Sequence, residues 1–208
     1  MNNLEKQALA SVRAALASIS KADAKQIYAL SFFLSDEDDD ARRPCITLGF
    51  NTLAQWQSSC PGAVGEQPLA KDAQEAKWNY AFWLQNQLAL LGAPDTQFAA
   101  LAHEWIVEQG WWYSDEDEFS EEEEIVERCD EAAFQIRSGY IELAIRLAQQ
   151  LHSGGIFAEL GIKPVPIIVH ELEYYSAIAQ QTLAANPAGL ANEFVAWVNS
   201  LASDKASA

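Results

Sequence analysis

The stretch from Trp111 to Leu151 reads WWYSDEDEFSEEEEIVERCDEAAFQIRSGYIELAIRLAQQL, and it joins an aromatic triplet to an acidic run and a long periodic segment. In the periodic segment, apolar or small residues recur in steps of three and four, at Ile125, Cys129, Ala132, Ile136, Tyr140, Leu143, Leu147 and Leu151. This spacing predicts a long helix with one buried face. Ser120 and Glu123 have the form of a capping box, so we expect the helix to begin there, with acidic side chains near its positive end.

Four segments have the pattern of β-strands. Residues 26–34 are apolar on both alternating faces, which is typical of a strand in the middle of a sheet that is covered on both sides. Residues 44–51 form a second apolar run, and the charged connector between the two runs indicates a hairpin. The β-favouring aromatic residues at 78–83 predict a third strand. Residues 165–170 predict a fourth, which Pro166 places at an edge of the sheet or at a strand start.

Helices are expected between these strands. Residues 3–19 carry a single apolar stripe, and residues 85–91 have the composition of a short helix. The least patterned section, residues 62–77, is predicted to be rich in loops. Three positions have the features of helix caps, namely Thr52, Asp95 and Asn186, the last of which is followed by proline at the first helical position.

Together these elements indicate an α+β fold. We expect a mainly antiparallel sheet of about four strands, packed with six to eight helices. A chain of 208 residues is long enough for one well-buried core, so the simplest organisation is a single domain over residues 1–208 with a frayed tail at 203–208.

The composition limits the function. The formal net charge of −17 repels phosphate, so we predict no nucleic-acid partner and no docking on anionic membranes. The same charge favours solubility and fast encounter with basic partners. The three cysteines, Cys45, Cys60 and Cys129, are too few and too irregularly spaced for a disulfide framework, which fits a reducing compartment. Residues 1–20 contain no continuous apolar leader, so a cytoplasmic location is expected.

One set of short segments follows in order along most of the chain from residue 25 onward: Ile27–Phe32, the acidic loop, Leu48–Thr52, Lys77–Trp83, Val165–Glu171, Glu173-Tyr174 and Asn186-Pro187. This set resembles the bacterial family called domain of unknown function 4303. The resemblance implies a bacterial cytoplasmic protein. The family has no established activity, so the resemblance implies no catalytic residue.

Two of the three histidines, His103 and His170, precede a glutamate. A zinc-protease helix requires a second histidine four positions after the first, and this chain has Val107 and Tyr174 there, so that motif is absent. Side chains at the end of the fourth strand could still gather into a pocket of an enzyme or small-ligand binder. The residues of this alternative site are Asn51, His170, Glu171, Glu173 and Tyr174.

The acidic loop resembles the opening of a calcium-binding loop at Asp36, Asp38 and Asp40. An EF-hand requires glycine at its sixth position and glutamate at its twelfth, where this chain has Ala41 and Thr47. A solvated charge run is therefore the favoured interpretation. The chain also contains no phosphate-binding glycine loop and no Gly-x-Ser-x-Gly elbow, so we predict no metal, no cofactor and no catalytic residue.

The remaining signal is an aromatic doublet directly beside an acidic run. Core packing accounts for most of the seven tryptophans, and on that interpretation the doublet only caps the edge of the core. Alternatively, rings rimmed by carboxylates are what a docking surface for a basic protein needs. The residues of this predicted surface are Asp36, Asp38, Asp40, Trp111, Trp112, Asp115, Asp117 and Glu121. We therefore favour a non-enzymatic binding module, for example an immunity-like inhibitor of a basic toxin, over the pocket near His170.

Overall fold

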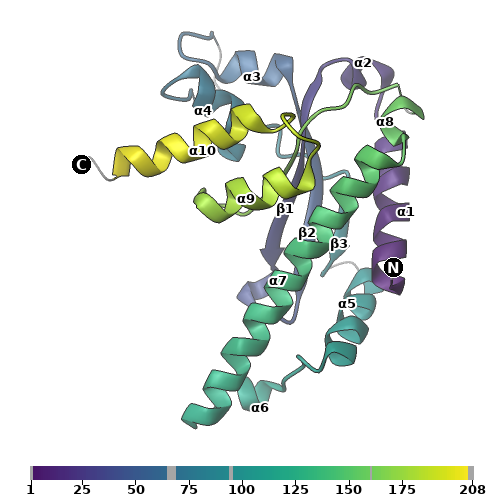
Figure 1. Cartoon of the computed structure of the whole chain (residues 1–208), viewed down its shortest axis with the longest axis vertical. Coiled ribbons are helices and arrows are strands. Elements are labelled where there is room, and N and C mark those ends of the chain that lie inside the picture. The colour runs from purple at the N-terminus through teal and green to yellow at the C-terminus, as the bar shows by residue number, and fades with distance from the viewer. Residues whose placement is uncertain (1, 65–68, 94–95, 160, 206–208) are drawn as a thin grey trace.

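A computed structural model describes residues 2–64, 69–93, 96–159 and 161–205 of this protein. Its centre is a four-stranded sheet with the order β3-β2-β1-β4, built from β1 (Ile27–Asp36), β2 (Pro44–Thr52), β3 (Ala89–Gly92) and β4 (Ile167–His170). The first three strands are antiparallel neighbours, whereas β4 runs parallel to β1. This mostly antiparallel sheet with helices around it confirms the predicted α+β fold (Figure 1).

The described part of the chain contains ten α-helices: α1 (Asn3–Ala17), α2 (Lys21–Ala24), α3 (Leu53–Ser59), α4 (Ala73–Trp78), α5 (Thr96–Gln109), α6 (Asp115–Glu118), α7 (Glu123–Ser153), α8 (Ile156–Glu159), α9 (Ser176–Ala185) and α10 (Asn192–Lys205). Two 3₁₀ turns, η1 (Glu37–Asp39) and η2 (Tyr80–Phe82), complete the elements. The number exceeds the six to eight predicted, because α2, α6 and α8 are turns of four residues that are too short to show a period.

Helices cover both faces of the sheet. On one face, Leu30 and Phe32 of β1 join the main core with residues of α1, α5, α7 and α8. On the other face, Ala29 and Ile168 join a second core with residues of α4, α9 and α10. The central position and two-sided burial of β1 are as its continuous apolar run predicted, and the β1–β2 hairpin is confirmed.

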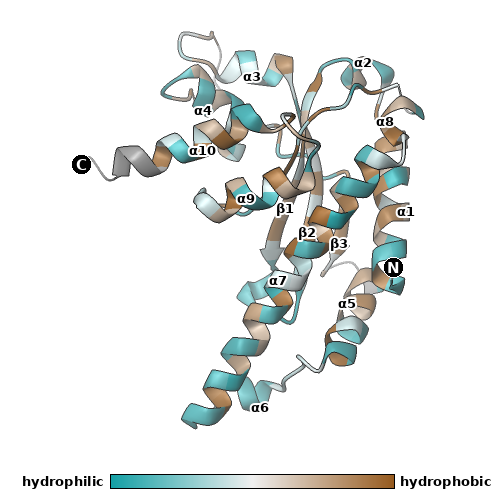
Figure 2. Ribbon diagram, viewed as in Figure 1, coloured by the Kyte–Doolittle hydropathy of each residue, from teal (hydrophilic) through white to brown (hydrophobic). Residues whose placement is uncertain are grey.

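The long helix α7 crosses the sheet, and its N-terminal end extends beyond the strands beside α6 (Figure 1). The predicted stripe is confirmed, since Cys129, Ile136, Tyr140, Leu143, Leu147 and Leu151 are buried. The predicted capping box is wrong. The helix begins after Glu122 without a side-chain cap, and the reciprocal box is made instead by Ser114 and Asp117, which start α6. Figure 2 shows the result, with hydrophilic colours over α6 and the first turns of α7.

The predicted third strand at residues 78–83 is wrong. Asp72 caps α4 by accepting from the backbone N–H groups of Gln74 and Glu75, and η2 follows α4 directly. Trp78 and Trp83 are buried in the second core, so their aromatic character reflects packing and not strand formation. The third strand is instead β3, which overlaps residues 85–91, where a short helix was expected.

The C-terminal part contains one confirmed and one corrected prediction. Strand β4 lies at the edge of the sheet, as Pro166 indicated. Asn186 does not cap the last helix. It ends α9, and its side chain accepts from the N–H of Ile167 and donates to the carbonyl of the same residue.

Three other boundaries can be compared. Thr52 caps α3 as predicted, by accepting from the N–H of Gln55. Asp95 lies outside the described residues, although the helix expected after it is present as α5. Residues 203–205 continue α10, so the predicted tail is helical there, and residues 206–208 lie outside the described residues. Among the described residues, no helix has the length and apolarity that crossing a membrane requires.

Candidate functional site

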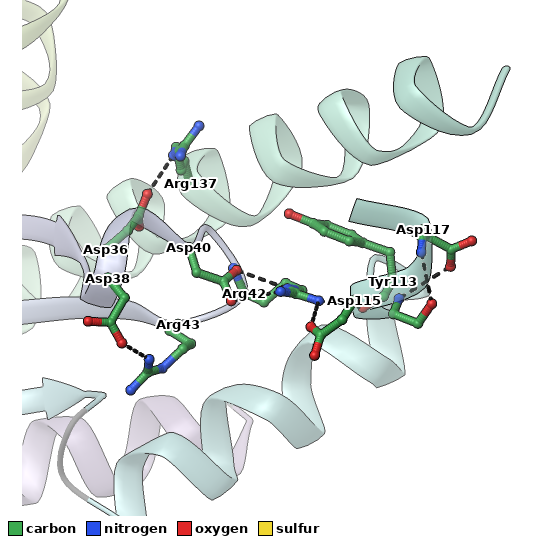
Figure 3. A network of polar contacts seen from close by, with 10 residues as sticks. Asp36, Asp38, Asp40, Arg42, Arg43, Tyr113, Asp115, Asp117 and Arg137 are labelled. Atoms are coloured by element: carbon green, nitrogen blue, oxygen red, sulfur yellow. Dashed lines mark hydrogen bonds and ion pairs between the residues drawn. The ribbon is translucent and has the colours of Figure 1, made fainter. Parts of the chain in front are cut away.

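Arg42 joins the two acidic segments. It lies at the tip of the β1–β2 hairpin, and its guanidinium group donates to both carboxylate oxygens of Asp40 at 2.9 Å. The same group pairs with Asp115 at 2.8 Å and donates to the backbone carbonyl of Tyr113 at 3.2 Å. Figure 3 shows Arg42 between the two segments. The fold therefore brings together two acidic runs, since the hydrogen bond from Arg42 to Tyr113 joins residues that are 71 positions apart in the sequence.

The Arg42 side chain is 8% exposed and that of Asp40 is 21% exposed, so their ion pair is largely shielded from water, whereas Asp115 is 82% exposed. Its guanidinium group also lies 4.9 Å from the ring centroid of Tyr113 and 5.7 Å from that of Trp112. The hydrogen bond to Asp40 raises the pKa of Arg42 further above its usual value. Burial opposes ionisation of Asp40, but the hydrogen bonds from Arg42 outweigh it and lower the pKa of this carboxyl.

Other predicted carboxylates are also paired within the protein. Asp36 pairs with Arg137 at 2.7 Å, and Asp117 pairs with Arg128 at 2.9 Å. Asp38 pairs with the neighbouring Arg43. Of the six carboxylates named from the sequence, only Glu121 has no ion pair within the described residues. The carboxylates chosen from the sequence therefore mainly hold this region in place.

A second group of carboxylates on the same region is exposed and has no ion-pair partner among the described residues: Asp39, Glu116, Glu118, Glu121, Glu122, Glu123 and Glu124. We call residues 36–43 and 111–126 the acidic end. Its tip is tightly turned, because Asp38 and Asp39 have φ angles of 57° and 59°, a conformation that aspartate tolerates better than most residues. The unpaired negative charge of the acidic end therefore comes from Glu121, which was predicted, and from neighbours of the other predicted residues.

The aromatic doublet divides between surface and interior. Trp112 is 45% exposed, whereas Trp111 is half-buried and packs edge-on against Trp105 with ring centroids 5.3 Å apart. Gly139 of α7 permits this packing, because a Cβ atom there would lie 2.6 Å from the Trp105 ring. Tyr113 is buried. One ring of the doublet is thus available for contact, and the other fixes its position.

Sequence reasoning missed further apolar side chains on this part of the surface. Phe119, within the acidic run, is 83% exposed, and Val126 is 39% exposed. Phe134, two turns further along α7, is 61% exposed. The signal was present, since Phe119 interrupts an otherwise acidic run and Phe134 falls between positions of the buried stripe.

A pocket of about 390 Å³ lies next to the acidic end. It is formed where the parallel strands β1 and β4 end, by the last residues of β1, the middle of α7 and the segment after β4. The pocket lining includes Asp36, Asp39, Arg137, Glu171 and Glu173. A smaller pocket of about 150 Å³ shares Asp39 and Arg137 with it and continues between the hairpin tip and α7. Two residues of the alternative site therefore line a real pocket.

His170 lies inside the protein and does not line this pocket. Its side chain faces the second core, where Nδ1 donates to the backbone carbonyl of Glu171 at 2.9 Å. Nε2 therefore accepts from the hydroxyl of Ser31 at 2.7 Å. Burial lowers the pKa of His170 to about 4, so the ring is neutral at pH 7. The pair resembles a serine–histidine dyad, but both residues are at most 1% exposed and offer no access to a substrate.

The other two residues of the alternative site are also structural. Asn51 is fully buried and donates to the hydroxyl of Tyr28 at 2.9 Å. Tyr174 stacks on His170 and accepts from the backbone N–H of Tyr80 at 2.9 Å. The five residues thus divide between the core and the pocket.

Metal and thiol chemistry find little support. Among the described residues, no group of three or more His, Cys, Asp or Glu side chains converges on a position for a metal ion. In the acidic loop, Asp36, Asp38 and Asp40 each pair with a different arginine. The three cysteines are free, and burial raises the pKa of Cys45 to about 11, which keeps its thiol protonated.

Comparison of the chain with protein-family models, with curated proteins and with solved structures gives no match. The resemblance to domain of unknown function 4303 therefore stays a prediction.

Proposed function

We propose that this protein is a binding module for a basic protein, and that the acidic end is its docking surface. The observation that carries the proposal is the position of Arg42, which fixes the two acidic segments side by side. A preformed surface loses little conformational freedom on binding, so more of its interaction energy is available as affinity.

The surface has the two components of a protein interface. Trp112 and Phe119 are exposed rings, and aromatic side chains supply most of the energy at interface hot spots. Exposed carboxylates that have no ion pair among the described residues belong to the same end of the molecule, which speeds encounter with a cationic partner and disfavours acidic ones. In its more specific form, our proposal is that the protein is an immunity-like inhibitor, which would cover the basic cleft of a toxin.

An enzyme centred on His170 has weaker support. Its ring is enclosed by Phe33, Tyr80 and Tyr174, and both of its nitrogens already have partners. A general base must reach a substrate proton directly or through one water molecule. The neighbouring pocket, whose lining contains no histidine, instead supports binding of a ligand.

The test is affinity capture from the native host at low salt, using the full chain with a tag at its C-terminus, followed by identification of the captured protein and its purification. We expect a basic protein that binds the purified chain directly. Binding should weaken as salt rises through about 0.1 M, where the Debye length falls to about 10 Å.

A matched pair of variants locates the contact. Changing Glu121, Glu122 and Glu124 to glutamine removes three charges from the acidic end. Changing Asp23 to asparagine and Glu142 and Glu159 to glutamine removes three exposed charges elsewhere. We expect only the first set to weaken binding, by about tenfold or more, since each neutralised contact costs up to about 1 kcal/mol. Equal loss in both sets, or a partner that is not basic, would contradict the proposal.

A further inference from the structure

The pocket at the ends of β1 and β4 combines apolar walls with an acidic rim. Phe33, Leu34, Ile141 and Leu172 supply apolar lining. The acidic lining residues Asp39, Glu171 and Glu173 make no ion pair within the described part of the chain. This combination suits a ligand with an aliphatic stem and a positively charged head, because the walls accept the stem and the rim accepts the head.

Tyr140 provides an independent sign that the pocket accepts a polar ligand. It lines the pocket together with Cys45, and it is only 2% exposed. Its hydroxyl group has no hydrogen-bond partner among the described residues. Buried hydroxyl groups are nearly always satisfied, so an unpaired one beside a cavity indicates that a bound group completes it.

We propose that this pocket receives an arginine side chain of the basic partner; this inference rests on the proposed function. The pocket lies against the acidic end, since Asp36 and Asp39 belong to both. Its volume of about 390 Å³ is in the lower part of the range of ligand pockets, about 300–1,000 Å³, and leaves room for one long side chain. An inserted arginine would anchor the partner beside the exposed rings.

Guanidinium chemistry fits this site better than an ammonium ion does. Arginine presents five N–H donors in a planar fork, and the acceptors here are three carboxylates without ion pairs among the described residues and one phenolic oxygen; one oxygen of Glu171 already accepts from the Tyr175 hydroxyl. A guanidinium group is also more weakly hydrated than an ammonium ion, so it enters a partly apolar pocket at lower cost. The rings of Phe33 and Tyr175 line the pocket and can stack on its flat face.

Arg137 already illustrates this chemistry at the edge of the pocket. Its Nε donates to Asp36 at 2.7 Å, and both residues belong to the lining. This ion pair neutralises Asp36, whereas Asp39, Glu171 and Glu173 make no ion pair within the described residues, although Glu171 accepts a hydrogen bond from the Tyr175 hydroxyl at 3.0 Å. Arg137 and Asp39 line both this pocket and the smaller one beside it.

The test is an NMR titration of the full chain with n-propylguanidine, which is the arginine side chain cut at Cβ. We expect saturable shifts at Tyr140, Ile141 and Leu172. The neutral analogue n-propylurea should give none at these residues, and n-butylamine, the lysine side chain, should bind more weakly. Changing Glu171 and Glu173 to glutamine should weaken n-propylguanidine binding by about tenfold, whereas changing Glu131 and Glu142 on the exposed side of α7 should leave it unchanged.

The variant Tyr140→Phe isolates the hydroxyl group. Because this hydroxyl has no partner to lose, the fold should keep its stability, while n-propylguanidine binding should fall by about threefold to tenfold, the worth of one hydrogen bond. Absence of shifts at the pocket, equal binding of n-propylurea, or tighter binding of n-butylamine would each overturn the inference. None of these results affects partner capture at the acidic end, so the two proposals fail separately.

Discussion

Two regions of this protein are rich in aromatic side chains. In one, the aromatic and polar side chains are largely buried, and in the other two of the rings are exposed and many of the polar groups are charged. In the second core, Trp78, Trp83, Phe194 and Trp197 are buried around Tyr28, Tyr80 and Tyr174, and His170 lies neutral beside them. At the acidic end, Trp112 and Phe119 are exposed, Arg42 lies 5.7 Å from the Trp112 ring, and exposed carboxylates belong to the same segments. The aromatic residues of the second core therefore pack inside the protein, whereas these two rings of the acidic end are accessible to a partner.

The difference shows where function is to be sought. His170 is chemically the most suggestive residue of the sequence, but both of its nitrogens are used to hold β4 against β1 and the following turn. Arg42 attracted no attention in the sequence, yet it organises the surface that the charges pointed to. The contrast predicts that substitutions in the second core damage stability, whereas those at the acidic end damage binding.

The largest contrast is expected between two tryptophans. Trp197→Ala should lower the free energy of unfolding by about 4 kcal/mol, because it empties a buried site in the second core. Trp112→Ala should lower it by less than about 1 kcal/mol, because that ring is half exposed, but should weaken partner binding. Urea unfolding and titration with the captured partner measure the two effects. If both variants lost a similar amount of free energy of unfolding, the proposed difference between the second core and the acidic end would be wrong.

The next contrast is between two adjacent arginines of the hairpin tip. Arg42→Ala should lower the free energy of unfolding by about 3 kcal/mol, because it leaves Asp40 without its cation in a largely buried setting. Arg43→Ala serves as the control and should cost less than about 1 kcal/mol, because its pair with Asp38 is exposed. If urea unfolding gave equal values for both variants, Arg42 would not be the residue that holds the acidic segments together.

The pH dependence of stability tests the role of His170. Burial lowers its pKa to about 4, against 6.5 in the unfolded chain, so the unfolded state takes up a proton first as the pH falls. The contribution of His170 is therefore fully present above pH 6.5 and is lost between pH 6.5 and 4, by roughly 3 kcal/mol. His170→Asn should lose correspondingly less stability over this window. If the free energy of unfolding depended on pH in the same way for both proteins, the histidine would be in contact with water and its pKa would not be lowered by burial.

The smallest effect concerns the support beneath Trp111. Gly139→Ala should lower the free energy of unfolding by about 1 kcal/mol, since the clash with the Trp105 ring outweighs the better helix propensity of alanine. The fluorescence of the variant should change as Trp105 and Trp111 move. If Gly139→Ala raised the free energy of unfolding and left the fluorescence unchanged, the two rings would not be in close contact with α7 at this position.

The sequence predicted those parts of the fold that are carried by long periodic segments. The hairpin of β1 and β2 and the buried stripe of α7 follow from burial that repeats over many residues. Short elements such as β3 and α6 were missed, because four residues contain only about one helical turn or two strand alternations, which is too little repetition to identify an element. The side chains at 78–83 were read as a strand because packing in the second core and strand formation both favour aromatic residues.

The candidate site could be predicted only as a set of residue types. The acidic runs and Trp112 were visible in the sequence, but their union through Arg42 depends on a contact across about 70 residues. Glu171 and Glu173 were also named, yet His170 was grouped with them, although its side chain points into the second core. Such assignments depend on tertiary packing, which one sequence does not display.

The most direct test of the central claim is hydrogen–deuterium exchange of the protein alone and in complex with the captured basic partner. Our account predicts slower exchange in the complex at residues 36–43 and 111–126, with the remainder of the protein unchanged. Slower exchange confined to α9 and α10, with the acidic end unaffected, would contradict it.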